Sequence, residues 1–162
     1  MKNLTSSIAT AFLVIACSCI SVAAATPPAA KDILMSFIET LDSPSTLDGK
    51  VTLTGAISER GTRHEDFSVV SANNDGSQVV VSGTSTITTA SGTITTKWTG
   101  TIYFDNATFG STLLAYIEGT ESVIGGTGAY AGITGKPGTF EATLDYTNGN
   151  VLGVFEAKVQ LR

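Results

Sequence analysis

Apolar and polar side chains alternate along most of the chain after residue 46. In the clearest stretch, Ile94, Trp98 and Ile102 fall on one face, and Thr95, Thr99 and Thr101 fall on the other. A period of two residues is that of a β-strand with one face buried and the other in water. The alternation therefore predicts a series of antiparallel strands over residues 46–162.

Short turn sequences separate the alternating stretches. The pairs Asp75-Gly76 and Asn148-Gly149 favour the tight turns of β-hairpins. About seven or eight strands joined by short turns are typical of a meander that closes into a barrel or folds as a sandwich. We therefore predict an all-β fold: a single antiparallel closed barrel of about eight strands, with a β-sandwich as the alternative.

The segment that precedes the predicted barrel, residues 26–45, fits two structures. Ile33, Phe37 and Leu41 recur at helical spacing, whereas Ile33, Met35 and Phe37 alternate as in a strand. The sequence leaves open whether this segment is a short helix or a first strand. We treat it as an N-terminal segment ahead of a barrel domain at residues 46–162.

Residues 1–25 have the pattern of a signal peptide. Lys2 is followed by an apolar run over residues 8–22 and then by a row of small residues that ends at Ala25. A charged start, an apolar centre and a small-residue cleavage site are the three parts of a secretory signal. We expect cleavage after Ala25, a secreted or periplasmic protein and no transmembrane span in the mature chain.

A second interpretation of the same segment involves Cys17. The residues Val14-Ile15-Ala16-Cys17 resemble the lipobox of bacterial lipoproteins, in which the cysteine carries the lipid. On that alternative, the protein is anchored at the cell envelope through Cys17. The only other cysteine, Cys19, lies in the same segment. We therefore expect no disulfide and no cysteine-based metal site in the mature domain.

The charge of the mature chain limits its partners. From Lys31 onward the chain has 14 acidic and 8 basic residues, so the net charge is 8 − 14 = −6. An acidic surface repels the phosphate backbone of nucleic acids. With one histidine, His64, and no mature cysteine, we expect neither nucleic-acid binding nor a metal site, and we expect no cofactor.

A glycine-rich stretch over residues 123–140 is the most distinctive part of the sequence. The spacing Gly126-x-Gly128-x-x-Ala131 matches a dinucleotide fingerprint superficially, but an alternating strand follows it where that fingerprint needs a helix. The glycines are better explained as turn and bulge residues. They are Gly125, Gly126, Gly128, Gly132, Gly135 and Gly138.

This stretch resembles the Gly-Gly-Thr-Gly-(Phe/Tyr)-x-Gly signature of the allene oxide cyclase and dirigent-like barrel superfamily. The likeness extends weakly through residues 79–84 and 93–100, and Pro137 departs from the pattern. The resemblance implies an eight-stranded barrel with an apolar cavity for a lipid-like or phenolic molecule, often assembled as a homo-oligomeric trimer. Because the signature consists of turn residues, it carries no catalytic residue with it.

Glu65 is the candidate catalytic residue. It shares the parity of Phe67, which would direct its carboxyl group into the barrel, where burial would raise its pKa and suit it to acid–base work. The competing interpretation places the charged run at residues 60–66 in an exposed turn or rim, because charged residues are seldom fully buried. For the cavity we predict five aromatic residues, namely Trp98, Phe67, Phe104, Tyr146 and Phe155.

Three functions are compatible with the sequence. The first is an exported, non-catalytic barrel that binds a small apolar molecule or serves as an extracytoplasmic module. The second is an allene oxide cyclase-like or dirigent-like enzyme, in which Glu65, Trp98 and Tyr146 steer a reactive intermediate. The third is a structural module with a solid core. An inward carboxyl group in an enclosed pocket would favour the enzyme, and Glu65 at the surface would exclude it.

Overall fold

The computed structural model describes residues 29–104, 114–145 and 147–161. Almost all of these residues lie in strands, and one short 3-10 helix, η1 (Gly128–Tyr130), follows the sixth strand. The strands are β1 (Lys31–Ser43), β2 (Thr46–Gly55), β3 (Glu59–Ala72), β4 (Gln78–Thr89), β5 (Gly92–Tyr103), β6 (Leu114–Gly126), β7 (Thr134–Gly135), β8 (Gly138–Asp145) and β9 (Asn150–Gln160).

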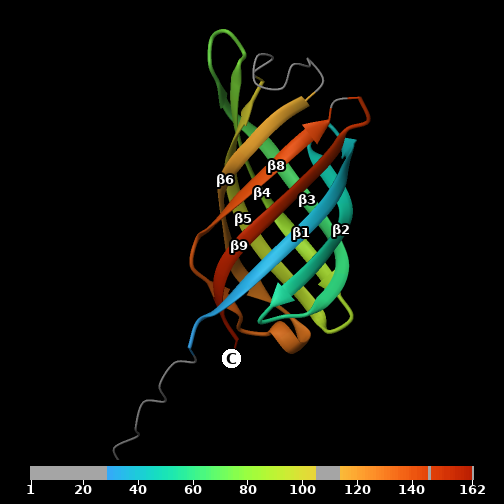
Figure 1. The fold of residues 1–162 in the computed structure, drawn as a ribbon, viewed down its shortest axis with the longest axis vertical. Coiled ribbons are helices and arrows are strands. Elements are labelled where there is room, and N and C mark those ends of the chain that lie inside the picture. Colours follow the sequence, from blue (N-terminus) through green and yellow to red (C-terminus); the bar gives the residue numbers. More distant parts are fainter. Residues whose placement is uncertain (1–28, 105–113, 146, 162) are drawn as a thin grey trace, which may run out of the picture.

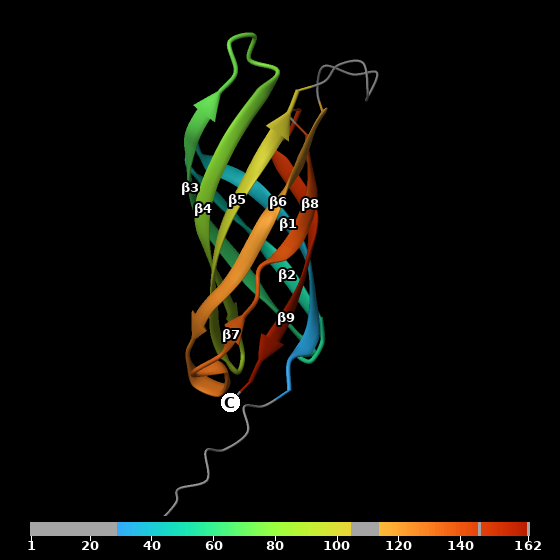
Figure 2. The same cartoon turned by 90° about the vertical axis from the view of Figure 1, so that its left-hand side faces the viewer.

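Eight of these strands form a closed antiparallel barrel. They follow the order β1-β2-β3-β4-β5-β6-β8-β9, and pairing of β1 with β9 closes the ring. The two-residue β7 pairs with the end of β9, outside the ring. Figures 1 and 2 show the strands inclined around a common axis, with the β3–β4 hairpin extending beyond one end. The prediction of a closed barrel is confirmed, and the sandwich alternative is wrong.

The segment before residue 46 is a strand of the barrel, not a helix. In β1, Ile33, Met35 and Phe37 are buried while the residues between them face outward or are only partly covered. The strand pairs with β2 along one edge and with β9 along the other. The barrel therefore begins at Lys31, ahead of the boundary expected at residue 46. Pairing on both edges decides a choice that the local spacing left open.

The predicted hairpin turns are present. Gly76, between β3 and β4, and Gly149, between β8 and β9, both have positive φ (71° and 69°), a backbone conformation that favours glycine. The glycine-rich segment is also built from turns. Gly125 and Gly126 end β6, Gly128 begins η1, Gly132 has a φ of 80°, Gly135 ends β7 and Gly138 begins β8. No strand–helix–strand unit surrounds Gly126 in this described segment, so the dinucleotide match has no structural basis.

The barrel has two ends with different interiors. At the end that holds η1 and β7, Tyr130 and Ile133 are buried, and both lie against Gly126 at the end of β6. We call this part the closed half. Its interior is filled by buried side chains that take no part in the cavity described below, namely Met35, Leu53, Ile57, Ile87, Ile94, Val123, Tyr130, Ile133, Phe155 and Val159.

Candidate functional site

The other half of the barrel encloses a cavity. Its volume is about 300 Å³, and it extends from the middle of the barrel to the rim, where Pro44 of the β1–β2 turn and Gly149 of the β8–β9 turn border it. We call this part the hollow half. Most of its lining is apolar and comes from Phe37, Leu41, Leu47, Phe67, Val81, Trp98, Ile102, Ile117, Phe140, Ala142, Leu144 and Val151.

Inward-facing glycines leave room for the aromatic side chains of this wall. A Cβ atom on Gly83 would lie 2.9 Å from the Trp98 ring, and one on Gly119 would lie 2.6 Å from the Phe140 ring. The two rings therefore pack directly against the backbone of neighbouring strands. They also contact each other edge to face, with centroids 5.8 Å apart. Rings held against the wall leave the centre of the barrel open.

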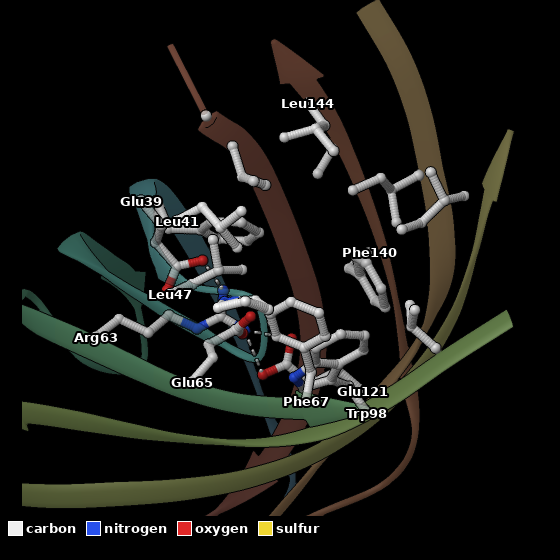
Figure 3. A pocket seen from close by; sticks show the side chains of 18 residues that line it. Glu39, Leu41, Leu47, Arg63, Glu65, Phe67, Trp98, Glu121, Phe140 and Leu144 are labelled. Carbon is white, nitrogen blue, oxygen red and sulfur yellow. Dashed lines mark hydrogen bonds and ion pairs between the residues drawn. The ribbon is translucent and has the colours of Figure 1, made fainter. Parts of the chain in front are cut away.

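The floor of the cavity is charged. Arg63 on β3 points inward and meets three carboxyl groups, those of Glu39 on β1, Glu65 on β3 and Glu121 on β6. We call these four residues the ionic floor. All four are at least 96% buried. Figure 3 shows the three carboxyl groups gathered around the end of the Arg63 side chain.

The contacts of Arg63 are specific. Its Nη1 donates to Glu39 Oε2 (3.1 Å), and its Nη2 donates to Glu121 (3.1 and 3.2 Å) and to Ser85 Oγ (3.0 Å). Nη2 is also paired with Glu65, and the guanidinium lies over the Phe37 ring, 4.2 Å from its centroid. The ionic floor therefore separates the two halves with a fixed set of contacts.

Strand register brings the hydroxyl groups of Ser85 and Thr96 to the level of the ionic floor. Ser85 lies opposite Glu65 across the β3–β4 ladder and donates to its Oε1 (2.6 Å). Thr96, opposite Ser85 across the next ladder, donates to Glu121 Oε1. On the other side, Gly49 pairs with Glu39, and a Cβ there would lie 2.7 Å from the Glu39 Cγ. A small residue at position 49 therefore makes space for the Glu39 side chain.

Burial in the ionic floor shifts the pKa of two of its carboxyl groups, those of Glu39 and Glu65. Burial raises the pKa of Glu39 to about 8, with Arg63 opposing the rise and the neighbouring carboxylates adding to it. Burial also raises the pKa of Glu65, against the effect of Arg63. Burial disfavours the charged form of Arg63, but attraction to Glu121, Glu65 and Glu39 outweighs it and raises the pKa of the guanidinium. At neutral pH, Arg63 is a cation and Glu39 holds its proton.

Three polar atoms at the cavity are buried without a hydrogen-bond partner among the described residues. They are Glu39 Oε1, Arg63 Nε and Trp98 Nε1, and all three residues line the cavity. Leaving a polar atom buried and unpaired costs about 1–3 kcal/mol. These atoms are therefore available to a bound molecule at the base of an otherwise apolar pocket.

The charged run at residues 60–66 is not an exposed turn. It lies within β3, where Arg63 and Glu65 are buried and the intervening His64 is exposed, paired with Asp48 on the outer face (2.8 Å). The exposed-rim interpretation is therefore wrong for Arg63 and Glu65. Regular alternation directs every second residue of the run inward, and Arg63 offsets the cost of burying the carboxyl groups.

The predicted aromatic residues are divided among different places. Trp98 and Phe67 lie in the cavity wall with ring centroids 6.4 Å apart. Phe155 is fully buried in the closed half, and Phe104 is half-buried just after β5, away from the cavity lining. Tyr146 lies outside the described residues, as do residues 1–28 with Ala25 and Cys17.

Sequence reasoning missed most of the ionic floor. Glu39 has the same parity as Phe37 and Leu41, and Glu121 has the same parity as Ile117 and Val123, so alternation could have placed both inside.

No group of histidine, cysteine, aspartate or glutamate residues in the described ranges is arranged to hold a metal ion. In the ionic floor, the guanidinium of Arg63 is the cation between the carboxyl groups.

Comparisons with known proteins add no assignment. A scan against protein-family models found no match to this chain, and searches of the curated proteins and of the solved structures found none either. Among the residues that the structure describes, no helix has the length and apolar character needed to cross a membrane. The resemblance to allene oxide cyclase and dirigent-like barrels stays a prediction from the sequence.

Proposed function

We propose that this protein is an exported barrel that binds one small apolar molecule in its hollow half. The observation that carries the proposal is the cavity of about 300 Å³ with predominantly apolar walls. Ligand pockets of proteins begin at about this size and combine apolar walls with a few polar groups that fix orientation. A cavity of this kind also argues against a module that is solid throughout.

Polar atoms of the floor and the wall support a defined orientation for the ligand. Glu39 Oε1 and Trp98 Nε1 are buried and have no hydrogen-bond partner among the described residues. A ligand with a polar group at one end satisfies such atoms while its apolar body contacts Phe140 and Leu144 nearer the rim. Export is supported by the signal-like pattern of residues 1–25, and lipid anchoring through Cys17 is the alternative.

Trp98 gives a direct test of binding because it is the only tryptophan in the chain and lies in the cavity wall. We expect titration with 1-octanol to change Trp98 fluorescence saturably. Ala142→Leu adds bulk to the cavity wall and should weaken binding at least tenfold. The matched control, Leu152→Ala, trims a half-exposed side chain on the outer face of β9 and should leave binding unchanged. Absence of saturable binding, or weakening by Leu152→Ala alone, would contradict the proposal.

A second candidate function is acid catalysis of the allene oxide cyclase-like or dirigent-like type. The observation that favours it is the buried, inward position of Glu65 beside a protonated Glu39 in the same cavity. A protonated carboxyl group can donate to a ligand oxygen. Incubation with 1,2-epoxyoctane tests this, because protonation of the epoxide oxygen and attack by water give the diol. Diol formation lost in Glu39→Gln or Glu65→Gln would support catalysis, and recovery of unchanged epoxide would contradict it.

A further inference from the structure

We propose that the molecule held in the hollow half is an apolar amine, and that its ammonium group binds the free oxygen of Glu39. This inference rests on the proposed function, since it names the chemistry of the ligand for the same cavity. It follows from the position of one unpaired carboxyl oxygen, from the charges of the ionic floor and from the aromatic wall beside it.

Glu39 offers an acceptor that nothing in the described chain uses. Its side chain is fully buried and lines the cavity, and its Oε2 accepts from Arg63 Nη1 at 3.1 Å. Its Oε1 is buried and has no partner among the described residues. When Glu39 is ionised, the contact missing at this oxygen is therefore a donor that arrives from the cavity side.

The charges of the ionic floor favour a cationic donor. Arg63 alone faces Glu39, Glu65 and Glu121, and both of its terminal nitrogens are already engaged by these groups. A ligand carboxylate would add a fourth acidic group to a single guanidinium. An ammonium group would instead supply a second cation where a carboxyl oxygen is free, and a charged hydrogen bond of this kind is stronger than one from a neutral hydroxyl.

The wall above the floor suits the same head group. Trp98 lies between Phe67 and Phe140, with ring centroids 6.4 and 5.8 Å away. Aromatic faces attract cations, and the attraction is larger where water is excluded. Leu144, Ile117 and Val151 then provide apolar contacts for the remainder of the ligand.

Binding of an ammonium group must displace the proton that Glu39 holds. The charged groups that face Glu39 are Arg63 and Glu65 from β3, Glu121 from β6 and Asp48 from β2, and together with burial they hold the pKa of Glu39 at about 8. An alkyl ammonium group, like that of lysine, keeps its charge to about pH 10. Affinity for the amine should therefore rise as the pH increases from 6 to 8, and binding at pH 7 should release about one proton.

The test compares three probes of equal chain length, namely n-octylamine, 1-octanol and octanoate, by calorimetry at pH 6, 7 and 8. We expect octylamine to bind at least tenfold more tightly than octanol at pH 8, with the advantage shrinking toward pH 6, and octanoate to bind weakest. Glu39→Gln should remove the advantage of octylamine while keeping octanol binding, which also shows that the variant is folded. The control Glu156→Gln, at an exposed position on β9, should behave as the wild type.

Two results separate failure of the inference from failure of the proposed function. Octanol or octanoate binding as tightly as octylamine at pH 8, or an advantage of octylamine that survives Glu39→Gln, would overturn the amine assignment and leave apolar binding in place. No saturable binding of any of the three probes would overturn both.

Discussion

The two halves of this barrel share the same eight strands but differ in what fills them. In the closed half, branched and aromatic side chains such as Ile87, Ile94 and Phe155 are fully buried. In the hollow half, glycines such as Gly83 and Gly119 lie opposite large rings, which pack against the wall. The ionic floor separates the two. An alternating pattern thus determines which side chains face inward, while the sizes of those side chains determine whether the interior is solid.

Removal of the single cation between the halves should have the largest effect. Arg63→Met leaves Glu39, Glu65 and Glu121 buried without a counter-charge, and breaking a buried ion pair in this way costs about 3–5 kcal/mol. We expect a loss of this size in the free energy of unfolding at pH 7, measured by urea denaturation. The loss should be smaller at pH 5, where protonated carboxyl groups need no cation. An equal loss at both pH values would show that charge does not hold the floor together.

A matched pair of isoleucines compares the packing of the halves directly. Ile87→Ala, in the closed half, should cost about 3–4 kcal/mol, since it opens a cavity in a solid core. Ile117→Ala, in the cavity wall, should cost about 1–2 kcal/mol, because one side of that side chain already faces empty space. Urea denaturation of both variants gives the difference. Equal losses would contradict the division into a solid and a hollow half.

The protonation of Glu39, in the ionic floor, makes the free energy of unfolding depend on pH. Because its pKa rises from 4.5 in the unfolded chain to about 8 in the native protein, the native state binds the extra proton between these values. Its contribution to stability is complete below about pH 4.5 and is lost as the pH rises to 8.

The variant Glu39→Gln removes this dependence. Its stability relative to wild type should therefore increase from pH 5 to 8, by up to about 1.4 kcal/mol per pH unit. Urea denaturation of both proteins at pH 5, 6, 7 and 8 measures the trend, and Glu156→Gln serves as the exposed control. A difference that stays constant across this range would show that Glu39 is already ionised at neutral pH.

The smallest effect is expected one residue away from Arg63. His64 faces outward, about half exposed, and its hydrogen bond to Asp48 raises its pKa. An exposed pair of this kind contributes little to stability because water and salt screen it. His64→Ala should change the urea midpoint by no more than the error of the measurement. A large loss would contradict the small contribution assigned to this exposed pair.

Much of the architecture could be predicted from the sequence, because strands and hairpins depend on local signals. The alternation around Trp98 and the Asp75-Gly76 turn are of this kind, and the parity of Glu65 gave its inward direction. The N-terminal segment could not be decided, since Ile33 and Phe37 fit both periods and only pairing on two edges selects the strand.

The candidate site was harder to predict because it depends on register between distant strands. Arg63 lies 24 residues from Glu39 and 58 from Glu121, so no local pattern joins them. Parity directs Phe155 inward but does not say at which level of the barrel it lies. The structure places it in the closed half, away from the cavity lining.

The most direct test of the hollow half is a crystal structure determined under xenon pressure, because xenon enters apolar cavities in proteins. We predict xenon density between Trp98, Phe140 and Leu144, on the rim side of Arg63, and none among Ile87, Ile94 and Phe155. The absence of xenon from the hollow half, or its presence in the closed half, would contradict the account.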